Sequence, residues 1–174
     1  DAATPLVILR AKDLGKTGWE RPDELDADVA FLQRLEAIRI EAGERMGLKN
    51  VASTVIPKPV LVAAPRTGGA ISARYFMPHA CHKALAITGG VGLATACATP
   101  GTVAQDITGP VTFPYTLAIE HPSGRLDVRL ETRTGRPEPV ALVLRTARRL
   151  FEGAVFAQVP ETEWAEQEQL KNSA

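Results

Sequence analysis

Residues 72–105 read SARYFMPHACHKALAITGGVGLATACATPGTVAQ, and the second half of this stretch decides the fold. Residues 88–98 contain only small or apolar side chains and no charge. A helix that is apolar all round has to be buried on all sides. At about 1.5 Å per residue it would be roughly 16 Å long, too short to cross a bilayer. We therefore expect a central core helix, ended by Pro100 and Gly101 and wrapped by a sheet.

The start of this helix is the first candidate binding site. Thr88 has the side chain of a helix cap, and Gly89 and Gly90 follow it with no side chain to cover the first amides. Unbonded N–H groups at a helix start favour a negatively charged group. The sequence therefore predicts an anion-binding position here.

The rest of the chain predicts a sheet around this helix. Mostly apolar or alternating runs rich in β-forming residues indicate strands. An amphipathic surface helix is expected from Asp26 or Asp28 to about Met46, and residues 145–151 have helical character. The fold class is therefore α+β, a curled, barrel-like sheet around a central helix. Strands are expected at residues 4–11, 60–64, 70–77, 115–120, 125–131, 140–144 and 154–159.

Composition narrows the possible functions. The chain has 20 basic and 20 acidic residues, so a general binder of nucleic acid or of anionic membranes is not expected. Two cysteines are too few for a disulfide framework and fit a reducing compartment, so we expect a cytoplasmic protein without a signal peptide. Because Asp1 rather than methionine opens the sequence, we expect a processed or partial chain.

A cluster of proton-handling side chains, His79, Cys81, His82 and Lys83, precedes the helix. It allows three interpretations: a metal site, an ordinary loop, or a proton-transfer or substrate-binding site. The spacing matches no standard zinc pattern, and the position before the helix start favours the third. Cys81 is expected to be the more exposed cysteine, with basic neighbours that would lower its pKa, and Cys97 to be a buried apolar residue.

Two further polar features leave their roles open. Residues 121–124, His-Pro-Ser-Gly, lie between two alternating runs and predict a hairpin turn. The hydroxyl of Ser123 serves either the turn itself or a bound carboxylate. Arg66 precedes Thr-Gly-Gly, and it is either an exposed cation or a bidentate carboxylate ligand.

Four further motifs are Pro65-Arg-x-Gly-Gly69, Arg74-x-Phe-x-Pro-His-x-Cys-His82, Ile119-Glu-His-Pro-Ser-Gly124 and Leu150-Phe-Glu-Gly153. Together they resemble the PrpF / 4-oxalomesaconate tautomerase family, and the resemblance is collinear over nearly the whole chain except the last fifteen residues. The resemblance implies a diaminopimelate-epimerase-like fold of two similar domains, each a β-rich barrel around one helix. It also implies an isomerase that shifts a proton in a small unsaturated tricarboxylate without cofactor or metal.

A full member is about twice this length, so the resemblance is to the second half of the family. It implies a second domain at residues 1–144, a segment at 145–159 that crosses back to a first domain, and a polar tail at 160–174. The principal lysine and cysteine would lie on the first domain. The substrate and that domain are the expected partners, and a homodimer is possible. The expected site residues are His82 for catalysis and, for substrate binding, Thr88, Gly89, Gly90, Ser123 and Arg66.

Three other functions compete with this one. A cysteine-based epimerase or racemase of the same fold would need a cysteine at the helix start, where Thr88-Gly89-Gly90 stands. A half-domain could instead act as a non-catalytic accessory module for a partner enzyme. A metal-dependent lyase would use the histidine and cysteine cluster.

Overall fold

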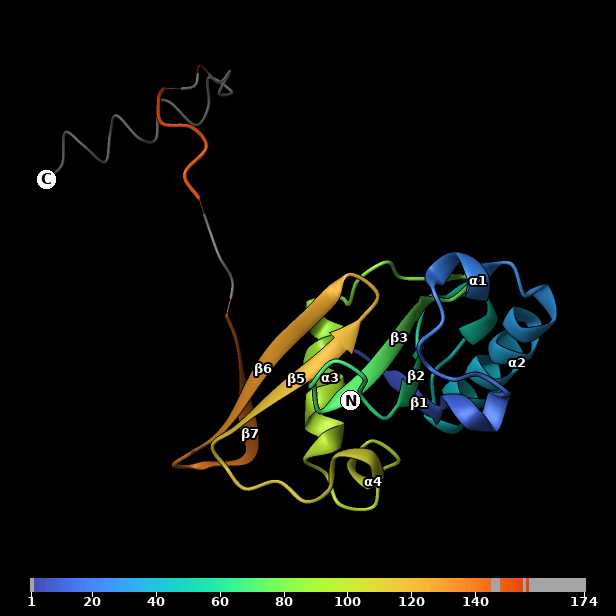
Figure 1. Ribbon diagram of the computed structural model, residues 1–174, viewed down its shortest axis with the longest axis horizontal. Coiled ribbons are helices and arrows are strands. Elements are labelled where there is room, and N and C mark those ends of the chain that lie inside the picture. The colour runs from blue at the N-terminus through green and yellow to red at the C-terminus, as the bar shows by residue number, and fades with distance from the viewer. Residues whose placement is uncertain (1, 145–147, 155, 157–174) are drawn as a thin grey trace, which may run out of the picture. The chain divides into compact units, whose positions relative to one another are not determined.

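The computed structural model describes residues 2–144, 148–154 and 156, and Figure 1 shows its ribbon. The chain divides into two compact units, residues 1–144 and 145–174. Every helix and strand of the described residues belongs to the first unit. The predicted α+β class is confirmed, because this unit combines helices with one seven-stranded sheet.

The sheet explains most of the predicted strands. In the described residues it comprises β1 (Leu6–Arg10), β2 (Lys58–Ala63), β3 (Ile71–Met77), β4 (Ala80–Cys81), β5 (Tyr115–His121), β6 (Gly124–Arg133) and β7 (Arg136–Val143). Its order is β1-β2-β3-β5-β6-β7, and the short β4 pairs with β3. The pairs β1–β2 and β3–β5 are parallel, and the other neighbours are antiparallel. The register of β5 and β6 runs to His121 opposite Gly124, which confirms the predicted hairpin.

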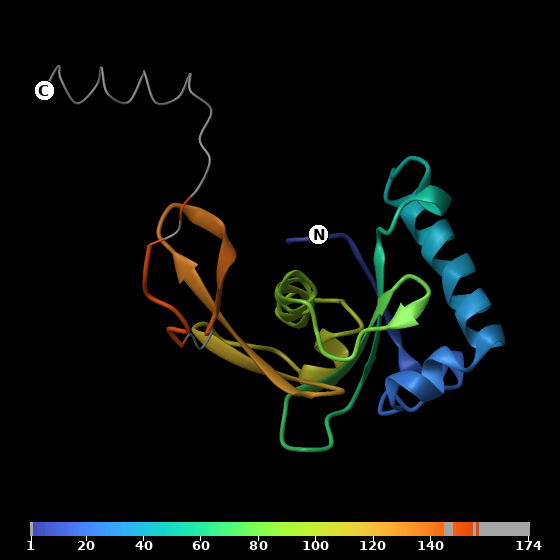
Figure 2. The ribbon, with the colours of Figure 1, turned by 90° about the horizontal axis from the view of Figure 1, so that it is seen from above.

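Helix α3 (Ile87–Cys97) lies inside the curve of this sheet, as Figure 2 shows. Leu93 and Cys97 are fully buried against the strands, so the predicted core helix is confirmed. The expectation of burial on every side is wrong. The described sheet ends at β1 and β7, and Thr95 and Ala96 line an open hollow of about 200 Å³ beside β1.

Glycines allow α3 to approach the sheet closely. A Cβ atom at Gly89 would lie 2.4 Å from Cε2 of Tyr75. At Gly90 it would lie 2.4 Å from Cδ2 of Leu126. Both distances are far below normal van der Waals separation, so these two positions require glycine for packing.

The two faces of the sheet bury separate cores. Along β3, Ala73 and Tyr75 belong to the cluster around α3, whereas Phe76 belongs to a cluster on the opposite face. This division follows from the period-two geometry of a strand. The side chains at even positions of β3 therefore point away from the central helix.

Helix α2 (Val29–Arg45) covers the outer face with Phe31 and Leu35. Oδ1 of Asp28 accepts a hydrogen bond from the amide of Phe31 at 3.0 Å, which confirms the predicted cap at Asp28. The short helices of the described residues are η1 (Ala11–Leu14), α1 (Pro22–Asp26), η2 (Val51–Ser53) and α4 (Gln105–Thr108).

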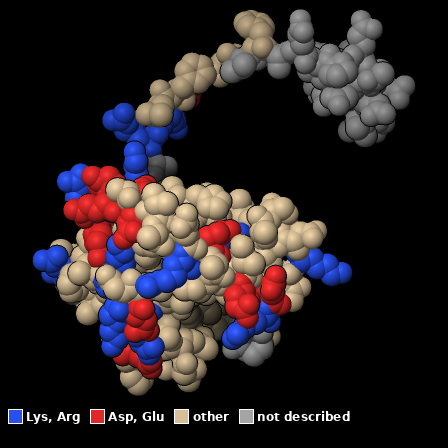
Figure 3. Space-filling view, turned by 90° about the vertical axis from the view of Figure 1, so that its right-hand side faces the viewer, with Lys and Arg blue, Asp and Glu red and all other residues tan. Residues whose placement is uncertain are grey.

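Both signs of charge are spread over the described surface. Figure 3 shows Lys and Arg intermixed with Asp and Glu on the side that carries α1 and α2. Exposed ion pairs such as Arg45–Glu41, at 2.8 Å, account for part of this pattern. In the part of the chain that the structure describes, no helix has the length and apolar character needed to cross a membrane.

The second unit carries no helix or strand in its described residues. Residues 148–151 were expected to be helical, and that prediction is wrong for them. The remaining residues of the expected helix, and residues 155 and 157–159 of the expected strand, lie outside the described residues. Leu150 and Phe151 are 82% and 70% exposed, so no packing stabilises a helix that short.

Candidate functional site

The candidate site is the start of α3, where no side chain caps the helix. Ala86 is the cap residue, with an extended backbone at φ −64° and ψ 141°. Its carbonyl already accepts the amide of Gly90 at 2.8 Å, so the helix begins at Ile87 and its cap lies two residues before Thr88, the predicted cap. The prediction that Thr88 caps the helix is therefore wrong, and Thr88 is its second residue with an exposed side chain.

The first three amides of α3 have no hydrogen-bond partner among the described residues. Those of Ile87, Thr88 and Gly89 occupy positions that have no acceptor within the helix. Gly90 was expected to offer a bare amide as well, but that amide is bonded to Ala86. The helix start therefore presents three donors near the positive end of the helix dipole.

The hairpin turn is tied to the loop that leads into α3. The hydroxyl of Ser123 donates a hydrogen bond to the carbonyl of Lys83, forty residues away in sequence. The same loop is held to β3, because the amide of His82 donates to the carbonyl of Tyr75 at 2.7 Å. The loop that carries His82 is thus tied to the hairpin turn that carries Ser123, so two residues expected in the site are linked through the carbonyl of Lys83.

His82 has a defined orientation and tautomer. Its Nδ1 accepts a hydrogen bond from the amide of Ala84 at 2.9 Å, and its ring meets the ring of Tyr75 edge to face at 6.1 Å. Because Nδ1 acts as the acceptor, the neutral imidazole carries its proton on Nε2. His82 is therefore arranged to donate a hydrogen bond from Nε2 rather than to accept a proton at Nδ1.

His121 is a site candidate that sequence reasoning passed over in favour of Ser123. Its Nδ1 accepts a hydrogen bond from the amide of Ser123 at 3.3 Å. Burial lowers the pKa of His121, a hydrogen bond to the backbone of Arg125 opposes this, and nearby Arg74 and His82 lower it further. The sequence feature that could have indicated His121 is its position as the first residue of the His-Pro-Ser-Gly turn.

The histidine and cysteine cluster does not form a common centre. Cys81 was expected to be exposed with a lowered pKa, and this is wrong: it is 5% exposed, and burial raises its pKa to about 12. Strand β4 turns its side chain into the outer core, while His79 stays exposed. Among the described residues, no three His, Cys, Asp or Glu side chains lie close enough to hold a metal ion.

Cys97 is the buried apolar residue that the sequence predicted. It is fully buried, and burial raises its pKa to about 12. It lies at the far end of α3, while Cys81 is enclosed in the other core. Neither cysteine stands at the start of α3, where a cysteine-based epimerase or racemase would need one.

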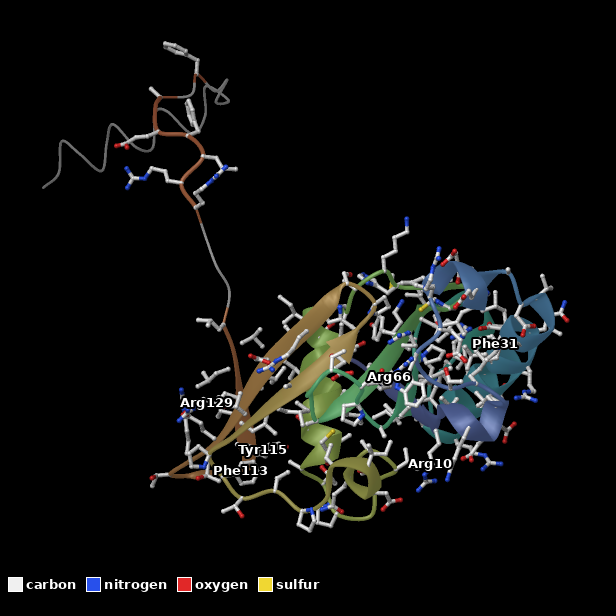
Figure 4. All side chains as sticks on the ribbon, in the orientation of Figure 1. Arg10, Phe31, Arg66, Phe113, Tyr115 and Arg129 are labelled. Atoms are coloured by element: carbon white, nitrogen blue, oxygen red, sulfur yellow. The ribbon has the colours of Figure 1, made fainter. Side chains whose placement is uncertain are left out.

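Arg66 lies on the outer face of the sheet. Its amide donates to Glu120 at 2.7 Å, and its guanidinium lies 4.8 Å from the ring centre of Trp19. Figure 4 shows Arg66 in front of the sheet, and Figure 2 shows its loop outside the curve that holds α3. No described contact joins Arg66 to the helix start, so the structure does not bring it together with His82.

Glu120 holds the loop that carries Arg66. Its carboxylate accepts the amides of Arg66, Thr67 and Gly69 at 2.7, 2.7 and 2.8 Å. Burial on its own would raise the pKa of Glu120, but these hydrogen bonds lower it to about 2. The carboxylate is therefore charged at neutral pH and serves to order the β2–β3 loop.

Comparison with known proteins agrees with this architecture. The model of the family described as "PrpF protein" matches residues 1–158. The chain belongs to the PrpF family. It is 51% identical over 157 residues to YbhH of Escherichia coli (strain K12), a match that covers 90% of this chain and 45% of that protein.

Other proteins similar to this PrpF-family chain are named as a tautomerase or an isomerase. It is 44% identical over 156 residues to the 4-oxalomesaconate tautomerase of Pseudomonas putida, covering 89% of this chain and 43% of that protein. A crystal structure of methylitaconate-delta-isomerase superposes with a TM-score of 0.75 at 28% identity, covering 88% of this chain and 44% of that one. The chain thus spans less than half the length of these relatives.

Proposed function

We propose that this chain forms one wall of the active site of an isomerase that shifts a proton within a small unsaturated tricarboxylate. Relatives named for oxalomesaconate, methylitaconate and methylaconitate isomerisation support this reaction class. The observation that carries the proposal is the convergence of the open start of α3 with the loop that holds His82 and is tied to Ser123. The fold that we propose for the longer protein is the two-domain, diaminopimelate-epimerase-like one.

The helix start would bind the negative charge of the substrate. A carboxylate facing the amides of Thr88 and Gly89 would accept two hydrogen bonds that are aligned with the helix dipole. When a proton leaves carbon, the conjugated anion spreads charge onto such oxygens, so the same donors would stabilise the transition state. Gly90 would contribute by packing rather than by its amide, which is already bonded.

His82 would act by orientation in this proposal. Its Nε2–H would donate to a substrate oxygen, while Ala84 holds Nδ1 and so fixes the ring. The proton itself would be removed from one end of a three-carbon unit and returned at the other, with the double bond moving between them. The groups that carry out these two transfers would lie on the part of the longer protein that this chain does not span.

The test is made in the longer protein with three acids: the tricarboxylates 4-oxalomesaconate and 2-methylaconitate, and the dicarboxylate methylitaconate. Turnover in D₂O is followed by ultraviolet absorbance and by NMR, which shows deuterium entering the far carbon. With its substrate identified, His82→Ala should lower kcat/KM about 10- to 100-fold, the value of one hydrogen bond to a charged group. His82→Asn, which keeps an acceptor near the Nδ1 position, should be equally impaired.

Two matched controls separate the site from its surroundings. His79→Ala changes an exposed histidine of the turn between β3 and β4 and should keep wild-type turnover. Ser123→Ala should lower kcat/KM by loosening the loop, whereas Ser53→Ala, whose hydroxyl also donates to a backbone carbonyl, should not. Full activity of both His82 variants, or no proton shift with any of the three acids, would refute the proposal.

A further inference from the structure

A second hollow lies on the outer face of the sheet, away from α3. It measures about 480 Å³, and Trp19, Arg66, Arg74, Glu120 and His121 contribute to its walls. We call it the Trp19 hollow. Its position follows from β3, since Arg74 alternates with residues that face the central helix and so points to the other side.

Arg74 is a buried cation in this hollow without an ionic partner among the described residues. It is 7% exposed, its Nε donates to the carbonyl of Glu20 at 2.6 Å, and its Nη1 donates to the carbonyl of Ala73 at 3.0 Å and to Ser72. All of these acceptors are neutral. A buried charge is normally paired, so this guanidinium has an unmet electrostatic requirement.

The acidic groups nearest to Arg74 are occupied elsewhere. Both oxygens of Glu120 accept backbone amides of the β2–β3 loop. Both oxygens of Glu20 accept backbone amides as well, from Thr17 at 2.6 Å and from Gly18 at 2.9 Å. These two carboxylates interact with the Arg74 charge electrostatically, but within the described residues neither forms a hydrogen bond or an ion pair with it.

A second guanidinium, that of Arg66, lines the same hollow. Arg66 stacks on Trp19, and the indole Nε1 of Trp19 donates to the carbonyl of Ala64 at 2.8 Å, which fixes the ring. Stacking through the face of a guanidinium leaves its N–H groups free in the plane. The hollow therefore combines one buried and one exposed guanidinium with a rigid aromatic wall.

We propose that the Trp19 hollow binds a carboxylate, with Arg74 and Arg66 as its hydrogen-bond donors and Trp19 as its apolar wall. Planar guanidinium groups match the two oxygens of a carboxylate. Two sources could supply it: a distal carboxylate of the isomerase's own substrate, or a separate small organic acid. Both share the same chemistry at these two arginines.

Trp19 supplies the probe for the binding test. The only other tryptophan of the sequence, Trp164, is changed to phenylalanine so that fluorescence reports on the hollow alone. Tricarballylate, a saturated tricarboxylate, is titrated at constant ionic strength, with sodium chloride as the blank. We expect a saturable change in Trp19 fluorescence, and Arg66→Gln should raise Kd at least about tenfold.

Arg129→Gln is the matched control, since Figure 4 shows this exposed arginine well away from Arg66, and it should leave Kd unchanged. Arg74→Lys keeps the charge but loses the planar fork, so it should weaken binding while the circular dichroism spectrum stays native. The absence of saturable binding, or equal Kd values for wild type, Arg66→Gln and folded Arg74→Lys, would overturn the proposal.

Steady-state kinetics of the longer isomerase then identify whether the bound carboxylate belongs to the substrate or to a separate organic acid. Only this kinetic experiment rests on the proposed function. Competitive inhibition by tricarballylate and a raised KM in Arg66→Gln would assign the hollow to the substrate. Non-competitive effects with an unchanged KM would assign it to a separate organic acid. Either result supports a carboxylate site, and the fluorescence test stands even if the isomerase activity does not.

Discussion

Glu120→Gln isolates the contribution of one carboxylate to the stability of the sheet. In the native chain, Oε1 of Glu120 accepts the amides of Thr67 and Gly69, and Oε2 accepts the amide of Arg66. The glutamine has one carbonyl oxygen and one NH₂ group, so one amide donor would face another donor. The variant should lose one bond outright and the ionic character of the others.

The pKa of Glu120 gives the size of this effect. A fall from 4.5 to about 2 corresponds to about 3 kcal/mol of preference for the charged form in the folded chain. Because the glutamine keeps one acceptor oxygen, we expect the free energy of unfolding to fall by about 2–3 kcal/mol at pH 7. Urea unfolding followed by far-ultraviolet circular dichroism measures this difference.

Acidification gives an independent check on the cause. A carboxyl whose pKa is lowered on folding stabilises the native state above its unfolded value, here about 4.5. That stabilisation is lost as the pH falls from about 4.5 to about 2. The stability difference between wild type and Glu120→Gln should therefore be constant above pH 5 and shrink toward pH 2.

The matched control is Glu131→Gln on the neighbouring strand. Glu131 pairs with Arg129 at 2.5 Å on an exposed surface, so its loss should change the unfolding free energy by less than about 1 kcal/mol. Our reasoning on Glu120 fails if its variant loses no more than this control. It also fails if the difference from wild type does not diminish in acid.

Three further changes test the packing of the two cores. Gly89→Ala should destabilise the fold by about 1–3 kcal/mol in urea unfolding, because the new Cβ would lie 2.4 Å from the ring of Tyr75. If the variant is as stable as the wild type, α3 can move away from Tyr75 and the close packing is not required. Arg39→Leu removes the hydrogen-bond donors to one carboxylate and two carbonyls at a fully buried position, and it should lower the free energy of unfolding by about 3–5 kcal/mol. Arg45→Leu on the same helix breaks only an exposed ion pair and should cost less than about 1 kcal/mol. Similar losses for both variants would contradict the structural role of the buried Arg39. Burial raises the pKa of Cys81 from 9 to about 12, so its thiol should react with iodoacetamide roughly a thousandfold more slowly in the folded chain than in urea. Mass spectrometry follows the labelling, and rapid labelling of the native chain would contradict the burial of Cys81.

The sequence was sufficient where the structure follows a local rule. Small uncharged residues predict the core helix α3, the period of 3.6 predicts α2, and period-two alternation predicts the β5–β6 hairpin. The capping role of Asp28 also depends only on residues within one helical turn. These features need no information about distant parts of the chain.

The candidate site was predictable only in part. His82 and Ser123 stand out by residue type, but the link between their two segments is a hydrogen bond between residues forty positions apart. The cap of α3 was predicted at Thr88, two residues late, because threonine is a common cap residue, whereas here the carbonyl of Ala86 accepts the first helical hydrogen bond. The close packing of Gly89 and Gly90 against Tyr75 and Leu126 of the sheet was not predicted, because it depends on the tertiary structure.

Tertiary structure alone decided the environment of the charged and reactive groups. Cys81 looked reactive beside basic neighbours, yet pairing of β4 with β3 turns it into the outer core, where desolvation raises its pKa. The sequence assigned no role to Glu120, Arg74 or Trp19, since their hydrogen-bond partners lie about fifty residues away along the chain. Local periodicity determines which elements form, whereas burial and charge pairing arise only when distant strands meet, and that is why chemistry was harder to predict than fold.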